Sequence, residues 1–276
     1  MVENGLDESS SAVKALCWNV RRASENSPVW AILAGLDPDI ALLQEVTSLP
    51  ADISATYTSL TAHPTGRKGK PQRFSTVILT KGQLSAGVPL VCLEPWANDE
   101  LHRLEGNFLS ATIVLDGVRL NVVSAYSPAW PVTEERLAGV DLSQVRLPGN
   151  PSLWATELLW LSLMNTMKQS DDPWVIGGDF NSSETFDTKW GAKPRGNAEV
   201  LNRMRALGLT ECLRSSHGQL VPTFKNPRGQ QVIHQLDHLW VSDPLPWALE
   251  GCVTGDPEVV FRSNLSDHLP VCATFA

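Results

Sequence analysis

The sequence predicts one α/β domain with mixed or antiparallel strand pairing. Short apolar runs rich in β-branched residues alternate with helical patterns along the chain. An Asp-Gly pair between two of these runs is a strong hairpin signal, and a hairpin requires antiparallel strands. Stretches that carry Pro and Gly occur at residues 66–71, 129–151 and 187–196, but each is too short to be a domain linker. We therefore expect a single domain over residues 13–276, preceded by a flexible N-terminus at residues 1–12.

The N-terminal part of the chain carries the first expected strands and the first expected helix. Ser27 and Pro28 predict a helix start, because a serine hydroxyl can cap a helix and proline suits the first helical position. This helix should end near Gly35 or Leu36. Three apolar runs with β-branched residues are expected strands: residues 13–20, 40–46 and 74–80.

The rest of the chain begins with the hairpin, which should turn at Asp116-Gly117 between strands at 109–115 and 118–126. Residues 153–168 form the longest helical candidate, and apolar residues occur almost all round it, so we expect burial on more than one side. The remaining expected elements are a strand at 174–178, a helix at 199–206 that ends before Gly208, and strands at 232–241 and 269–275.

Composition and charge are those of an ordinary globular protein. Of the 276 residues, 42% are hydrophobic and 19% are charged, and the formal net charge is −8. An acidic chain argues against binding nucleic acid by bulk attraction, although net charge says nothing about a local groove. Ten Trp against two Tyr indicate a large aromatic part of the core, or indole rings that line a cleft.

Cysteine usage and hydropathy bear on the compartment. The five cysteines are odd in number and none forms a CxxC pair, so neither a disulfide framework nor a zinc ribbon is indicated. The polar, acidic start has no apolar signal region, and no run approaches the roughly 20 apolar residues that span a bilayer. We expect a cytoplasmic protein without membrane contact, and a monomer by default.

Polar residues stand where the expected strands end. Each one alone has a structural explanation, such as a cap, a turn residue or a histidine that only packs. Together they can converge on one rim of a sheet sandwich, where a rigid scaffold supports them. The set comprises Asn19 in CWNV, Glu45 in LLQEV, Tyr126 in SAYSP, Asp179 and Asn181 in IGGDFN, Asp237 in QLDHLWVS, and Asp267 with His268 in SDHLPV.

These fragments, in this order, resemble the endonuclease/exonuclease/phosphatase superfamily over residues 13–276. GDFN combined with a C-terminal SDHxPV is highly specific, and WN and QE near the N-terminus add to it. The resemblance implies a four-layer α/β/β/α sandwich with two mixed, mostly antiparallel sheets. It also implies a divalent-metal-dependent phosphoesterase.

The resemblance also implies a role for each matched residue. Glu45 matches the main metal-binding glutamate, Asn19 supports the metal and the phosphate end of the site, and Asp267 lies near the metal. Asp179 and Asn181 match the pair around the attacking water and the scissile phosphate. His268, oriented by Asp237, matches the His–Asp dyad, and Tyr126 matches a tyrosine that contacts the phosphate.

Elementary chemistry agrees with these roles. A hard cation held by carboxylate and amide oxygens counters the charge on a phosphodiester, and oxygen ligands favour Mg²⁺ or Mn²⁺ over Zn²⁺. Asp179 could accept a proton from water, while Asp237 would favour a cationic His268 that donates a hydrogen bond to the transition state. The reverse assignment, with His268 as the base, stays open.

Substrate contacts are weaker hypotheses. Arg21 stands where some apurinic-endonuclease relatives carry an acidic residue, so it could contact phosphate or form a salt bridge within the site. Tyr126 differs from deoxyribonuclease I and the sphingomyelinases, which have histidine there. Trp130 could stack on a base, or it could pack under its own loop. The basic residues of segment 67–73 could grip phosphates or be a solvated loop.

Three functions are consistent with these observations. The first is hydrolysis of phosphodiester bonds in DNA or RNA by an endonuclease or exonuclease. The second is a phosphatase or phosphodiesterase acting on a small molecule or lipid headgroup, such as an inositol phosphate or a nucleotide. The third is a binding module that has lost catalysis, which the filled catalytic positions argue against.

Overall fold

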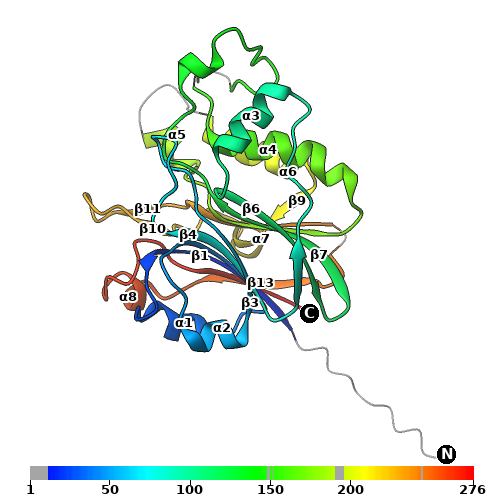
Figure 1. The fold of residues 1–276 in the computed structure, drawn as a ribbon. Helices are drawn as coiled ribbons and strands as arrows, with labels where there is room; N and C mark the ends of the chain where they lie inside the picture. The colour runs from blue at the N-terminus through cyan, green and yellow to red at the C-terminus, as the bar shows by residue number, and fades with distance from the viewer. Residues whose placement is uncertain (1–11, 148–149, 151, 190–195, 244) are drawn as a thin grey trace, which may run out of the picture.

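The computed structural model describes residues 12–147, 150, 152–189, 196–243 and 245–276. The expected flexible N-terminus lies outside the described residues except for Ala12. Two six-stranded sheets form the centre of the molecule (Figure 1). The first sheet has the order β13 (Leu249–Thr254), β14 (Val271–Phe275), β1 (Val13–Ala23), β2 (Ile40–Val46), β4 (Ser75–Thr80) and β3 (Thr58–Ala62). The second has the order β5 (Gln83–Ala86), β6 (Phe108–Leu115), β7 (Val118–Tyr126), β8 (Trp174–Asp179), β12 (Asp237–Ser242) and β9 (Leu209–Glu211).

Pairing in both sheets is mixed and mostly antiparallel, as the sequence predicted. Only β1 with β2 and β7 with β8 are parallel among the described pairs. Parallel neighbours end at the same edge of a sheet, so each sheet brings two strand ends together. A small separate ribbon pairs β10 (Phe224–Lys225) with β11 (Val232–His234).

Helices cover the outer faces of the two sheets, which confirms the four-layer sandwich (Figure 1). Between the sheets, Leu42 and Ile78 from one sheet pack in a single cluster with Val122 and Leu239 from the other. The described helices are α1 (Val29–Leu36), α2 (Ala51–Thr56), α3 (Pro95–Arg103), α4 (Ala155–Thr166), α5 (Thr185–Lys189), α6 (Asn197–Ala206), α7 (Cys212–His217) and α8 (Pro257–Val260), with 3-10 turns at Glu134–Leu137 and Met167–Gln169.

The outer layers bury apolar faces of both sheets. Val29, Trp30 and Leu33 of α1 pack on the first sheet, while α4 and α6 pack on the second. The sequence predicted that the longest helix would be buried on more than one side, and most residues of α4 are buried. Aromatic residues also fill the core, since Trp18, Trp174 and Trp240 are among its largest fully buried side chains.

The predicted hairpin of β6 and β7 is confirmed. Asp116 and Gly117 have φ angles of 50° and 77°, the left-handed pair that a tight two-residue hairpin requires. No helix in the described part of the chain is both long and apolar enough to cross a lipid bilayer.

The strand expected at 232–241 was wrong as a single element. It is two strands, β11 and β12, which belong to different sheets. The break comes at Leu236 and Asp237, whose backbone N–H groups both donate to the hydroxyl of Thr223, at 3.0 and 3.1 Å. That hydroxyl comes from a distant segment, so the apolar pattern of the run could not reveal it.

Other differences concern element ends and short elements. The Ser27 side chain does not cap α1, where Pro28 occupies the cap position. The first strand continues to Ala23 through an irregularity at Arg21 and Arg22, which have φ angles of 49° and 58°. Several elements were not predicted, because their exposed faces carry polar residues without a clear period: β3, β5, β9, β13, α3 and α7.

Candidate active site

The strand ends place the predicted polar residues at one edge of the sandwich. In the second sheet, Asp179 ends β8 and lies in register with Tyr126 at the end of β7 and with Asp237 at the start of β12. In the first sheet, Asn19 lies beside Gln44 of β2. Pairing within each sheet therefore groups these residues before any side chain is considered.

Two glycines before Asp179 allow the two sheets to approach each other closely. A side-chain carbon at Gly177 would lie 2.8 Å from Leu239 and 3.1 Å from Cys17 of the facing sheet. At Gly178, where φ is 141°, it would collide with the carbonyl of Ala125. The sequence Gly-Gly-Asp thus lets a buried strand deliver a carboxylate against the opposite sheet.

His268 and Asp237 form the predicted dyad. Their closest atoms, His268 Nδ1 and Asp237 Oδ2, are 2.9 Å apart, and the Thr223 hydroxyl donates to the same carboxylate at 2.7 Å. On the other side of the ring, Nε2 lies 3.8 Å from Oδ2 of Asp179. Phe224 covers the imidazole, with ring centroids 4.8 Å apart. One histidine therefore lies between two buried carboxylates.

Burial and charge oppose each other in this group. Burial alone would lower the pKa of His268, but the negative charges of Asp237 and Asp179 raise it to about 10. Burial raises the pKa of Asp179 to about 7, and the nearby imidazolium limits that rise. At neutral pH His268 is therefore protonated and positively charged. The Asp179 carboxyl gains or loses its proton near neutral pH.

The side chain of Asn19 and the backbone of Asn181 hold Asp179 in place. Asn19 Nδ2 donates to Oδ2 of Asp179 at 3.2 Å, and the backbone N–H of Asn181 donates to Oδ1 at 3.0 Å. Asn181 has a left-handed φ of 49°, and its Nδ2 donates to the carbonyl of Ser127 at 2.7 Å. This strained backbone, fixed from both sides, is the kind of geometry that concentrates at functional sites.

Glu45 and Tyr126 form a second part of the site. The Tyr126 hydroxyl donates to Oε1 of Glu45 at 2.9 Å, and the guanidinium of Arg22 lies 3.9 Å from Oε2. Glu45 has a left-handed φ of 59° at an irregularity of β2. Burial and the charges of Glu45 and Asp179 raise the pKa of Tyr126, so the phenol stays protonated at neutral pH. Because Tyr126 pairs in register with Asp179 and its hydroxyl binds Glu45, this tyrosine connects Glu45 to the Asp179 part of the site.

Asp267 and Arg21 lie at the outer side of the dyad. Arg21 Nε is 3.9 Å from Oδ1 of Asp267, and its guanidinium donates to Asn264 at 2.7 Å. Of the two alternatives for Arg21, the structure therefore shows the ion pair within the site. The side chain of Arg21 is 41% exposed, so the pair is accessible to solvent and contributes little to stability.

The segment that carries Asp267 and His268 is tied to β1. The Ser266 hydroxyl donates to the carbonyl of Asn19 at 2.7 Å and accepts from the N–H of His268 at 3.1 Å. The indole of Trp18 donates to the His268 carbonyl at 2.9 Å. The bonds to Asn19 and from Trp18 join residues about 250 positions apart, and they explain how two distant segments of the chain meet at one site.

Several supporting residues were missed by the sequence analysis. Ser127 and Ser266 flank the motifs, so their neighbourhood was a usable signal. Thr223, which holds Asp237, lies in a segment with no motif, and nothing in its pattern indicated it. Trp130 is half-buried; its neighbour Ala129 lines the cavity beside Asn181.

Two groups of residues have the chemistry to hold a metal ion. The ligand atoms of Asp179, Asp237 and His268 lie within 4.8 Å of one another, but Asp237 and the imidazole already bind each other. Glu45 has a partly exposed carboxylate with one short hydrogen bond, and carboxylate oxygens are the donors that a hard divalent cation prefers. The sequence predicts Glu45, Asn19 and Asp267 as the metal-holding residues, and this assignment stays a prediction.

The fold and the site define the class of protein: an α/β sandwich with a buried Asp–His–Asp group at the strand ends. The chain matches the Endonuclease/Exonuclease/phosphatase family over residues 16–268, and it belongs to that family. No curated protein matches the sequence.

Solved structures share the fold at low sequence identity. An AP endonuclease from Archaeoglobus fulgidus has a TM-score of 0.65 and 19% identity, covering 95% of this chain and 99% of that one. The 3' phosphatase NExo from Neisseria, solved with a product DNA hairpin, has a TM-score of 0.62 and 22% identity over 96% and 100% of the two chains. The catalytic domain of Xenopus laevis APE2 has a TM-score of 0.64 and 18% identity over 95% and 91%.

Proposed function

We propose that this protein is a divalent-metal-dependent phosphodiesterase that hydrolyses phosphodiester bonds in nucleic acid. The observation that carries the proposal is the buried Asp179–His268–Asp237 group, with Nε2 of the histidine facing the Asp179 carboxylate. Membership of the family supports hydrolysis of phosphate esters. The AP endonuclease, the 3' phosphatase and the 3'-5' exonuclease among proteins of the same fold support a nucleic-acid substrate.

In the proposed mechanism, Asp179 accepts a proton from the attacking water. Its pKa of about 7 is close to neutral pH, where a general base works best. Asn181 lies two residues further on, with its amide nitrogen bound to Ser127, and it positions the water or a phosphate oxygen. His268, kept cationic by Asp237, donates a hydrogen bond from Nε2 to the charge that develops on the phosphoryl oxygens.

Glu45, Asn19 and Asp267 would hold Mg²⁺ or Mn²⁺ in this scheme. The bound cation would supply Lewis-acid stabilisation of the phosphate charge. Tyr126 orients the Glu45 carboxylate through its hydroxyl, and it remains a candidate for contact with the phosphate. Arg22 is largely exposed beside Glu45, and a substrate phosphate could reach it.

The test compares the wild-type protein with Asp179→Asn on single-stranded DNA, plasmid DNA, RNA and inositol phosphates, each with Mg²⁺, Mn²⁺ or EDTA. We expect cleavage of nucleic acid that EDTA abolishes, and a roughly 10²- to 10⁴-fold lower kcat for Asp179→Asn. Asp116→Asn is the matched control, since Asp116 is an exposed turn residue and Asn suits its left-handed backbone. Unchanged activity of Asp179→Asn, or turnover of inositol phosphates alone, would contradict the proposal.

A further inference from the structure

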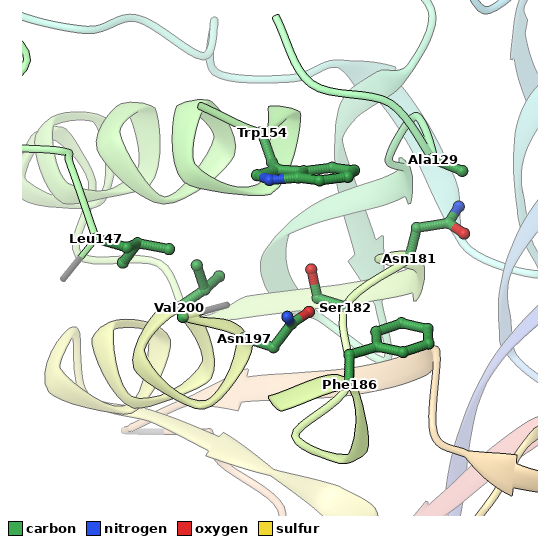
Figure 2. A pocket seen from close by; sticks show the side chains of 9 residues that line it. Ala129, Leu147, Trp154, Asn181, Ser182, Phe186, Asn197 and Val200 are labelled. Carbon is green, nitrogen blue, oxygen red and sulfur yellow. The ribbon is translucent and has the colours of Figure 1, made fainter. Parts of the chain in front are cut away.

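A cavity of about 260 Å³ opens beside Asn181. Figure 2 shows Trp154 on one side of this cavity and Phe186, Asn197 and Val200 on the other, with the Ser182 hydroxyl between them. Its lining includes Leu147 and is mostly apolar. Pockets for drug-sized ligands are usually about 300–1,000 Å³, so this cavity suits a single small ring system.

Three elements hold the cavity walls in place. Trp154 precedes α4, and its backbone N–H donates to the carboxylate of Glu157 at 2.5 Å. The Asn197 side chain accepts from the N–H of Ser183 at 3.3 Å, which joins α6 to the loop after β8. Phe186 packs against His234 of β11, with ring centroids 4.3 Å apart. The walls are thus preformed, as a binding pocket requires.

The cavity is continuous with the reaction site through Asn181. The backbone N–H of this residue binds Asp179, and its side chain lies on the cavity rim next to Ala129 (Figure 2). Because Asn181 both lines the cavity and binds Asp179, a substrate whose phosphate lies at Asp179 can place a neighbouring group in the cavity. We therefore take the occupant to be a part of the substrate.

The lining indicates what kind of group binds. It contains aromatic rings and aliphatic side chains, together with the neutral polar groups of Asn181, Ser182 and Asn197, and no charged side chain among the described lining residues. An inositol phosphate carries several anionic groups and needs Lys or Arg partners. A nucleobase is uncharged and flat, stacks on aromatic rings, and presents hydrogen-bonding edges to amides and hydroxyls.

We propose that this cavity takes the unstacked base of the nucleotide whose phosphate is cleaved, so that the enzyme acts on unpaired nucleotides. This inference rests on the proposed function, and it adds the form of nucleic acid that the site accepts. A base inside a duplex cannot enter the cavity, because its faces and edges are occupied by its neighbours and its partner. Single strands, frayed ends and flipped nucleotides remain as substrates.

The test uses a single-stranded oligothymidylate with one base-free tetrahydrofuran residue in the middle, cut by the Mg²⁺-loaded enzyme and resolved at single-nucleotide resolution. We expect cleavage at one phosphate flanking the base-free residue to fall roughly 5- to 150-fold below that at neighbouring phosphates, because a stacked base contributes about 1–3 kcal/mol. Trp154→Ala should slow cleavage at the base-bearing positions, so that the rates at base-bearing and base-free positions become similar. Trp154→Phe should keep most of the difference between these two rates. Trp247→Ala, a half-buried indole on another loop, should keep all of it.

Equal cleavage along the strand by the wild-type enzyme, or preferred cleavage at the base-free residue, would overturn the proposal. So would an equal loss at all positions in Trp154→Ala. A binding measurement distinguishes a failure of the base-binding proposal from a failure of the proposed nuclease function. Asp179→Asn should quench the fluorescence of an oligonucleotide that carries 2-aminopurine, through stacking on Trp154, even if no strand is cut. Absence of cleavage by the wild-type enzyme counts against the proposed function, and absence of quenching counts against the cavity.

Discussion

Replacing Glu157 with Gln should stabilise the protein at neutral pH. Glu157 lies in the first turn of α4 and is fully buried, and one of its carboxylate oxygens accepts from the N–H of Trp154. The other oxygen, Oε1, is buried without a hydrogen-bond partner among the described residues. A glutamine keeps the acceptor for Trp154 and removes the buried charge.

The size of the effect follows from the pKa of Glu157. Burial raises it from 4.5 to about 7 in the folded protein. Below pH 4.5 Glu157 is protonated in both the folded and the unfolded state, so its ionisation does not lower the stability of the protein. As the pH rises from 4.5 to 7, the unfolded chain releases its proton first and the folded state loses stability. The difference between the two pKa values, 7 and 4.5, corresponds to a loss of at most about 3 kcal/mol in the free energy of unfolding. This loss is fully present above pH 7.

Thermal and denaturant unfolding of the wild-type protein and Glu157→Gln at several pH values tests this reasoning. The two proteins should have similar stability at pH 4, and the variant should gain up to about 3 kcal/mol, or a Tm roughly 6–10 °C higher, at pH 8. Glu135→Gln removes an exposed carboxylate and should show no such dependence. The reasoning is refuted if Glu157→Gln differs equally at pH 4 and pH 8, or is less stable at pH 8.

Two further predictions concern the dyad and the strand that carries Asp179. Asp237→Asn should lower kcat by roughly 10²- to 10⁴-fold, because His268 loses the neighbouring negative charge that keeps it cationic. Steady-state kinetics on the folded variant measures this change. A loss of kcat below tenfold would exclude the role of Asp237 in the dyad. Gly178→Ala should cost about 2–6 kcal/mol through left-handed strain and collision with Ala125, whereas Gly208→Ala, with φ of 81° and open space around it, should cost about 1 kcal/mol in the same unfolding assay. Equal losses in the two glycine variants would mean that the close approach of Gly178 to Ala125 of β7 is unimportant.

Much of the fold could be predicted from local pattern. The hairpin at Asp116-Gly117 was predicted with its strands, because the turn chemistry and the alternation of the strands act over a few residues. The break between β11 and β12 could not be predicted, since it depends on a hydroxyl from the distant residue Thr223. Strand β13 was also missed, because only Cys252 of its residues is buried and its sequence LEGCVT has no clear alternation of apolar and polar residues.

The candidate site also has one part that could be predicted from the sequence and one part that could not. The short motifs named Asp179, Asp237 and His268 as candidates, and the structure brings these side chains into contact. Their proposed roles came from the resemblance to the endonuclease/exonuclease/phosphatase superfamily, which these short motifs carry. A support such as Thr223, which binds the Asp237 carboxylate, comes from a segment without a motif of its own.

The sequence by itself determined the class of the fold and the family, and it named the candidate site residues, because turn residues, strand patterns and motifs are written in consecutive positions. The tertiary structure alone decided the charge state of His268, the ion pair of Arg21 with Asp267 and the cavity beside Asn181. Each of these depends on burial and on distances of a few ångströms between segments that are far apart in the chain. Electrostatic and packing energies change steeply over such distances, and spacing along the sequence does not record them.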